Sequence, residues 1–180
     1  AHHNQIAILS ETDLSGMSIL AKLDLSYNNI TQISSRALSN CANLYELNLA
    51  NNPFAQLPSL KNQSNLYQLS LAHCQIEALP DDICITCPRL GILSYNTIGS
   101  VTYDAFQGLV NLKYLYLDHN VIRELPPGIF EDLVSLHRVD LNNNKIQSLP
   151  DNLFQKTNII TDIRLNNNEI RIISSAAFSS

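Results

Sequence analysis

The sequence has no long uninterrupted run of apolar residues. No stretch approaches the ~18 apolar residues that a membrane-spanning helix requires. A secretory signal peptide is also absent, as expected for a mature or trimmed chain. We therefore expect any membrane attachment to come only from segments outside this chain.

Charged residues are sparse and do not cluster. They make up 15% of the chain, which has a net charge of −5 at pH 7 and no run of like charges. Domains that bind nucleic acid usually have a concentrated basic surface, so the sequence predicts no nucleic-acid partner. The hydrophobic content of 45% is enough for a core and excludes a disordered chain.

Motifs that perform chemistry are missing as well. The chain has no glycine-rich phosphate loop, no H-E-x-x-H and no G-x-S-x-G. We therefore predict that the protein is not an enzyme and that it uses no cofactor or metal.

The chain instead has an internal repeat. Apolar residues occupy positions 1, 4, 6, 11, 14, 19 and 22 of a unit that begins at Leu112, and Asn120 lies at position 9. In that unit the apolar residues are Leu112, Leu115, Leu117, Ile122, Leu125, Phe130 and Leu133. Similar units begin near residues 20, 44, 66, 88, 136 and 160, and a partial unit covers residues 1–19. One unit of about 24 residues cannot bury this apolar set alone, so the units are expected to stack.

Six segments of the chain match the pattern L-x-x-L-x-L-x-x-N/C, so the chain resembles leucine-rich repeat proteins. These segments are "LAKLDLSYN", "LYELNLANN", "LYQLSLAHC", "LKYLYLDHN", "LHRVDLNNN" and "ITDIRLNNN". The resemblance implies an α/β solenoid: a horseshoe with a concave parallel sheet of about seven strands and a convex side of loops, 3-10 turns and short helices. We expect one domain over residues 1–180. Because the chain begins and ends within a repeat, we also expect its terminal caps to be absent.

The asparagine at position 9 has a structural explanation. A buried amide there can satisfy backbone groups where the chain turns out of the strand, repeat after repeat. We predict such a ladder at Asn28, Asn52, Asn96, Asn120, Asn144 and Asn168.

One unit is irregular and has two alternative registers. The first places Leu93 at position 6, with Gly91 at 4 and Pro88 at 1, and keeps phase with the following units. The second places Leu90 at position 1 and Leu93 at 4, and must delete two strand residues. We prefer the first, which predicts that Leu90 and Ile92 face solvent.

The four cysteines fall on core positions of the repeat. Cys84 and Cys87 have C-x-x-C spacing, but no second ligand pair accompanies them, so a zinc site is not expected. Cys41 lies at position 22, and Cys74 takes the place of asparagine at position 9. Buried free thiols are the favoured state, and a Cys84–Cys87 disulfide is the alternative.

Tyrosine and histidine concentrate on the surface of the predicted sheet. Positions 2, 3, 5, 7 and 8, which are free of core packing, have six of the seven tyrosines and all five histidines. Tyrosine gives rigid contact area in binding surfaces, although neighbouring rings could instead form a stabilising ladder. His73 and His119 lie two repeats apart, too far for one metal ion. The predicted ligand-binding residues are Tyr27, Tyr45, Tyr67, His73, Leu90, Ile92, Tyr95, Tyr114, Tyr116, Asp118, His119, His137, Arg138, Asp140 and Arg164.

Two N-glycosylation sequons, at Asn29 and Asn62, favour an extracellular location. The 24-residue repeat with phenylalanine at position 19 also resembles animal extracellular members of the family. We predict a secreted protein or one on the extracellular side of the plasma membrane.

The pattern is most similar to variable lymphocyte receptors and Toll-type receptor ectodomains. This resemblance implies immune recognition of a protein or glycan ligand, including a microbial one, through the concave face. The alternatives are an adhesion or matrix protein that self-associates as a homodimer, and an intracellular scaffold.

Overall fold

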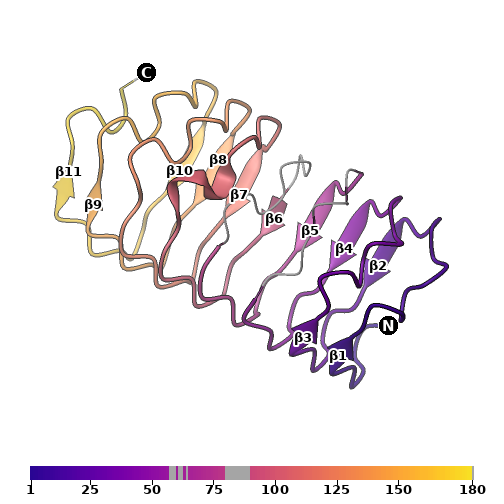
Figure 1. Ribbon diagram of the computed structural model, residues 1–180. Helices are drawn as coiled ribbons and strands as arrows, with labels where there is room; N and C mark the ends of the chain where they lie inside the picture. Colours follow the sequence, from indigo (N-terminus) through magenta and orange to yellow (C-terminus); the bar gives the residue numbers. More distant parts are fainter. Residues whose placement is uncertain (57–59, 61–62, 64, 80–89, 180) are drawn as a thin grey trace.

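A computed structural model describes residues 1–56, 60, 63, 65–79 and 90–179 of the chain, with the backbone alone described at 90–92. Pro88, Cys84, Cys87 and the sequon Asn62 lie outside the described residues. The chain winds as a solenoid whose successive turns lie side by side (Figure 1).

One side of the solenoid is a seven-stranded parallel sheet, as the sequence predicted. Its strands lie in the order β10-β8-β7-β6-β5-β4-β2, which follows the chain from one repeat to the next. The strands are β2 (Lys22–Asp24), β4 (Glu46–Asn48), β5 (Gln68–Ser70), β6 (Leu90–Ile92), β7 (Tyr114–Tyr116), β8 (Arg138–Asp140) and β10 (Asp162–Arg164). Each strand is short because only three residues separate the two turns that carry the chain into and out of the sheet. We call the outer surface of this sheet, with the flanking positions 2, 7 and 8, the sheet face.

The irregular repeat joins this sheet through a shifted register. Ile92 is aligned with Ser70 of β5 and with Tyr116 of β7, both at position 5, so the preferred register is correct from Ile92 onward. Leu90, however, is aligned with Leu69 at position 4, and the register shifts between them. The preferred register is therefore wrong by one residue at Leu90, because β6 takes up an additional residue at Gly91 as a bulge.

The core lies between the sheet and the return arcs. Positions 4, 6 and 11 supply fully buried side chains, such as Leu115, Leu117 and Ile122. Phenylalanines at position 19 form a second column, with Phe106, Phe130 and Phe154 stacked at ring-centroid distances of 6.1 and 5.6 Å. Each repeat thus buries its apolar residues against its two neighbours, which is why the fold needs stacked repeats.

The return arcs contain little regular structure. Two small parallel pairs form there, β1 (Ile8–Leu9) with β3 (Gln32–Ile33) and β9 (Ser148–Leu149) with β11 (Ile172–Ile173). A single 3-10 helix, η1 (Tyr103–Phe106), is found among the described residues. Figure 1 shows the β1–β3 and β9–β11 pairs on the side of the solenoid away from the seven-stranded sheet. Within the described residues, no helix is long and apolar enough to cross a bilayer.

Candidate ligand-binding face

Two adjacent columns run along the edge of the sheet face where the strands end. The first, the amide column, is formed by position 9 and consists of Asn28, Asn52, Cys74, Asn96, Asn120, Asn144 and Asn168. The second, the left-handed column, is formed by position 8 and consists of His3, Tyr27, Asn51, His73, Tyr95, His119, Asn143 and Asn167. The amide column is mostly buried, whereas most of the left-handed column is exposed.

The amide column satisfies backbone groups of two repeats at once. The side-chain amide of Asn120 donates to the carbonyl of Leu117 in its own repeat and to that of Leu93 in the preceding one, at 3.0 and 3.1 Å. Its oxygen accepts from the backbone N–H of Ile98 at 3.0 Å. The same three bonds recur at Asn52, Asn96, Asn144 and Asn168. This column therefore ties the repeats together.

Cys74 is the exception in the amide column. Its thiol donates weakly to the carbonyls of Leu49 and Ala72, at 3.5 and 3.7 Å. A thiol is a weak acceptor and cannot reproduce the bond that an amide oxygen accepts in the other repeats. Burial raises the pKa of Cys74 to about 11, so the thiol is protonated at physiological pH.

The backbone of the left-handed column is unusual. All eight of its residues have φ between 53° and 59°, and only one other non-glycine residue in the described part of the chain, Asn152, has a positive φ. The conformation is held by a ladder in which the N–H of one repeat donates to the position-7 carbonyl of the next. Tyr95 to Asp118, for example, and His119 to Asn142 are both 3.0 Å. Asparagine and histidine adopt this region readily, whereas bulky residues such as Tyr27 and Tyr95 seldom do.

The rings of the left-handed column stack along the solenoid. Tyr95 lies between His73 and His119, with ring centroids 4.3 and 4.1 Å away and nearly parallel planes. His3 and Tyr27 form a second stack at 4.4 Å. Because each ring covers a face of its neighbour, the stacks present mainly ring edges and polar atoms to solvent.

A second aromatic pair lies on the opposite edge of the sheet face. Tyr45 and Tyr67 stack with ring centroids 4.8 Å apart, just before strands β4 and β5. Between this pair and the left-handed column, a hollow of about 330 Å³ opens over the strands. Its polar floor consists of Lys22, Asp24, Glu46, Asn48, Gln68 and Ser70. Lys22 pairs with Glu46 at 2.8 Å, so much of the charge on this floor is neutralised.

Tyr114 and Tyr116 mark the change from aromatic to charged residues along the sheet face. Tyr114 is 41% exposed and lies beside His137, at a centroid distance of 6.4 Å. The Arg138 guanidinium lies over the Tyr116 ring, 5.3 Å from its centroid. Arg138 therefore joins the aromatic surface to the charged one.

The charged surface is a network of four side chains. Arg138 contacts Asp140 at 3.2 Å and Asp162 at 3.4 Å, while Arg164 contacts the same carboxylates at 3.7 and 3.2 Å. Burial alone would lower the pKa of Arg138, but the hydrogen bond to Asp140 and the surrounding charges raise it. Asp140 was expected on the surface and is instead buried, because both arginines cover it.

Beyond this network the face is rich in amides. Asn167 donates to Asn143 at 2.9 Å, and the backbone N–H of Asn166 donates to the side chain of Asn142 at 2.7 Å. No group of three His, Cys, Asp or Glu residues in the described part of the chain is placed to hold a metal ion.

Sequence reasoning missed the left-handed backbone and one hydrogen-bond network. Asp118 accepts from Ser94 at 2.5 Å and pairs with His119 at 2.8 Å, linking two repeats on the face. The recurrence of Asn, His and Tyr at position 8 was the available signal, since asparagine and histidine favour left-handed backbone. The side chains of Leu90 and Ile92 lie outside the described residues.

Comparison with known proteins identifies the family. A family model described as leucine rich repeat matches residues 2–61, 64–122, 92–145 and 134–180, which together are nearly the whole chain. The chain belongs to the leucine-rich repeat family. Leucine-rich repeat domains are typically interaction scaffolds without enzymatic activity, and protein partners are their general ligands.

Solved leucine-rich repeat structures resemble this chain over almost its full length. A leucine-rich repeat protein of Leptospira interrogans is 24% identical with a TM-score of 0.83, covering 96% of this chain and 43% of its own. A chain of the Toll–Spatzle complex of Drosophila is 25% identical with a TM-score of 0.75, covering 92% of this chain and 24% of its own. The present chain thus spans less than half the length of either structure. No curated protein matches the sequence.

Proposed function

We propose that this chain is the ligand-recognition module of a secreted or cell-surface leucine-rich repeat protein, and that it binds a protein ligand through the sheet face. The similarity to a chain of the Toll–Spatzle complex, described as a hub of development and innate immunity, supports a role in immune recognition. A microbial protein would be one such ligand. The contacts would be made by Tyr27, Tyr45, Tyr67, His73, Tyr95, Tyr114, Tyr116, Asp118, His119, His137, Arg138 and Arg164. Asp140 would act indirectly, because it is buried and pairs with the two arginines. Leu90 and Ile92 of β6 are further predicted contacts.

The observation that carries this proposal is the pair of tyrosines in left-handed backbone. Tyr27 and Tyr95 have φ of 53° and 57° and are 51% and 45% exposed. At three other positions of the same column the chain has asparagine, which takes this conformation with less strain. Two large rings have therefore been placed in an unfavourable conformation at the edge of the sheet face.

The alternative is that the rings only stabilise the fold by stacking. A favourable aromatic pair contributes about 0.5–1.5 kcal/mol, whereas a residue held in a sparsely populated backbone region costs about 1–3 kcal/mol. The two effects are of similar size and opposite sign, so stacking gives little net reason to place tyrosine there. Binding supplies the missing reason, because tyrosine gives contact area with only two torsions to order.

The orientation of the rings favours a protein ligand over a sugar. Stacking of a sugar ring on an aromatic side chain requires a free aromatic face. In the stacks of Tyr95 with His73 and His119, both faces of Tyr95 are already covered, and Tyr45 and Tyr67 cover one face of each other. Ring edges, phenol hydroxyls and the amides of Asn142 and Asn166 suit hydrogen bonding to the polar surface of a protein.

The test is a double substitution, Tyr27→Asn with Tyr95→Asn, which gives both positions the residue found elsewhere in the column. The variant and the wild type would probe arrays of extracellular proteins and of glycans. We expect a protein ligand whose affinity falls at least tenfold in the variant, as for buried aromatic anchors, with the melting temperature within about 4 °C of wild type.

The matched control is Tyr103→Asn, because Tyr103 is equally exposed but lies on η1, away from the sheet face. Its side chain donates to Glu131 on the neighbouring arc. The control should bind as wild type does. A large loss of melting temperature in the double variant with unchanged affinity would show that the rings are structural.

The homodimer alternative is tested on the same proteins. Light scattering over a concentration range would reveal self-association, and a wild-type dimer that the double variant cannot form would mean that the sheet face binds a second copy. In that case the function would be adhesion rather than recognition of a foreign ligand.

The extracellular location rests on Asn29, whose sequon lies just beyond the amide column. Asn29 is exposed and its backbone N–H donates to Ile6 at 3.0 Å, so its side chain is accessible on a turn of fixed structure. We expect secretory expression to add a glycan there, detected as a mass removed by a glycosidase and absent in Asn29→Gln. An unmodified Asn29 in secreted protein would remove this support.

A further inference from the structure

All five histidines of the chain gather on the sheet face. His2 and His3 lie at its first turn, His73 and His119 in the left-handed column, and His137 just before β8. Four of them pack against tyrosine rings: His3 on Tyr27, His73 and His119 on Tyr95, and His137 beside Tyr114. His2 packs edge-on against His3. No histidine lies elsewhere in the chain.

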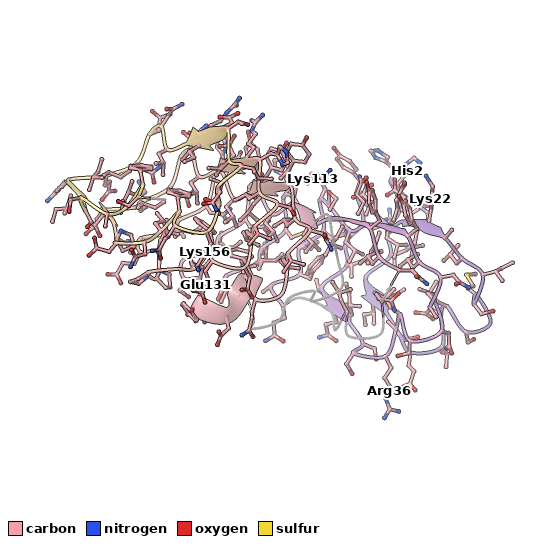
Figure 2. All side chains as sticks on the ribbon, turned by 90° about the horizontal axis from the view of Figure 1, so that it is seen from above. His2, Lys22, Arg36, Lys113, Glu131 and Lys156 are labelled. Atoms are coloured by element: carbon pink, nitrogen blue, oxygen red, sulfur yellow. The ribbon has the colours of Figure 1, made fainter. Side chains whose placement is uncertain are left out.

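The permanent charges of the same face nearly cancel. Its described side chains include four cations and five anions: Lys22, Lys113, Arg138 and Arg164 with Asp24, Glu46, Asp118, Asp140 and Asp162. Their net charge is −1 when the histidines are neutral and would be +4 with all five protonated. The other charged residues of the sequence are seven basic and eleven acidic, so their sum is negative. Figure 2 shows His2, Lys22 and Lys113 on one side of the molecule, and Arg36 and Glu131 on the opposite side.

Histidine is the side chain whose charge ordinarily responds to mild acid. Imidazole ordinarily changes charge between pH 5 and 8, whereas aspartate and glutamate ordinarily require a pH near 4. Five imidazoles on a face whose permanent charges nearly cancel are therefore the groups best placed to set the sign of its charge.

The stacks offer favourable contacts to a charged imidazole ring. An imidazolium on a tyrosine ring gains a favourable cation–π contact, which applies to His3 on Tyr27 and to His73 and His119 on Tyr95. His119 is also paired with Asp118, whose second oxygen accepts from Ser94. These contacts would favour keeping the stacks when the imidazole rings are charged.

The two remaining histidines have charged neighbours of opposite sign. His2 lies near Asp24. Burial alone would raise the pKa of Asp24, but hydrogen bonds from Ser26, and to a smaller degree the nearby His2, lower it. His137 adjoins Arg138, and its backbone N–H donates to the carbonyl of Lys113. The His137 ring nitrogen lies 2.8 Å from the carbonyl oxygen of Ser135, which can accept its proton in the charged form.

We propose that the sheet face becomes a cationic docking surface at mildly acidic pH and there binds an acidic protein surface more tightly than at neutral pH. This inference rests on the proposed function in one respect only, namely that the sheet face is the binding face. It adds the charge of the partner and the pH at which binding is favoured.

The experiment measures binding of poly-L-aspartate, a protein-like polyanion that remains ionised at pH 5.5, to the wild type at pH 7.5 and 5.5 in low salt. We expect affinity to rise about tenfold or more on acidification, because several charges are added to one face. A variant with His2, His3, His73 and His119 changed to Asn and His137 changed to Gln should lose this increase. Lys156→Gln, on a return arc, should keep it.

A second measurement guards against misfolding of the fivefold variant. In NMR spectra of the wild type, the imidazole ring protons should shift with pH while the amide signals of the amide column stay unchanged. The smaller variant His73→Asn with His119→Asn should lose part of the binding increase. The proposal is overturned if the wild type shows no increase, or if the fivefold variant keeps it. A larger response to dextran sulfate than to poly-L-aspartate would overturn the acidic protein as partner.

Failure of this inference and failure of the proposed function give different results. The double variant Tyr27→Asn with Tyr95→Asn keeps every histidine, so it should keep its pH-dependent binding of poly-L-aspartate even if no natural ligand is found. Conversely, a natural ligand that binds with equal affinity at both pH values would support the recognition function and contradict the proposed dependence of binding on pH.

Discussion

The amide column and the left-handed column lie next to each other in every repeat, but they differ in burial and in how much their residues vary. At position 9 the side chain is buried, has the same chemistry in six repeats and uses its hydrogen-bonding groups on the backbone. At position 8 the side chain is mostly exposed, varies among Tyr, His and Asn, and bonds to other side chains of the face where it is paired, as His119 does to Asp118. Adjacent residues of the chain thus have different roles: position 9 stabilises the solenoid, and position 8 forms part of its exposed surface.

The difference has a geometric origin. The turn after each strand needs a left-handed residue at position 8, and this turn directs the next side chain into the solenoid. The backbone ladder forms in the same way with tyrosine, histidine or asparagine at position 8. Such a position can vary with the ligand, and the strain of about 1–3 kcal/mol at a bulky residue is partly offset by ring stacking.

The largest effect is expected from Asn120→Ala in the amide column. It would leave the buried N–H of Ile98 without its partner, and it would remove one of the two amide donors at the carbonyls of Leu93 and Leu117. These carbonyls keep their bonds from the side chains of Asn96 and Asn144. At about 1–3 kcal/mol for the unsatisfied N–H and about 0.5–1.5 kcal/mol for each of the two lost bonds, we expect a loss of about 2–6 kcal/mol. The melting temperature should fall by about 10 °C, measured by circular dichroism.

Asn168→Ala is the matched control, because its amide makes the same bonds while only partly buried. Its loss should be clearly smaller, since water can replace some of those bonds. Equal losses of stability at Asn120 and Asn168 would mean that burial does not determine how much the amide column stabilises the fold.

An intermediate effect is expected at Cys74 and depends on pH. Burial raises the pKa of its thiol from 9.0 to about 11, so between these values the unfolded state loses a proton that the folded state keeps. This contribution to stability is complete below pH 9 and is lost as pH rises through 11. A shift of two units corresponds to about 2–3 kcal/mol.

The measurement compares chemical denaturation of wild type and Cys74→Asn at pH 8 and pH 10.5. The asparagine variant should lose less stability over this range, because it lacks the thiol and its amide can make the bonds of the column. If both proteins lose the same amount, the thiol is accessible to solvent in the folded state.

Much of this comparison was predictable from the sequence. The apolar repeat and Asn120 gave the solenoid, the parallel sheet and the surface on which the tyrosines lie, because burial imposes the same period in every unit. The bulge at β6 was not predictable, since Leu90 and Ile92 compete for the same strand and only pairing with β5 and β7 settles their alignment. The ring stacks also could not be predicted from the sequence, because they depend on side-chain torsions in neighbouring turns.

The smallest effect is expected from Asn51→Tyr in the left-handed column. Asn51 lies between Tyr27 and His73 and interrupts the row of rings, so a tyrosine there would meet a ring on each side. Two new stacks of about 0.5–1.5 kcal/mol each would offset the strain of a bulky residue at φ near 59°. The melting temperature should change by less than about 4 °C, and near-ultraviolet circular dichroism should report the longer row. A loss as large as that of Asn120→Ala would contradict the distinction between the columns, because it would show that position 8 also determines the stability of the fold.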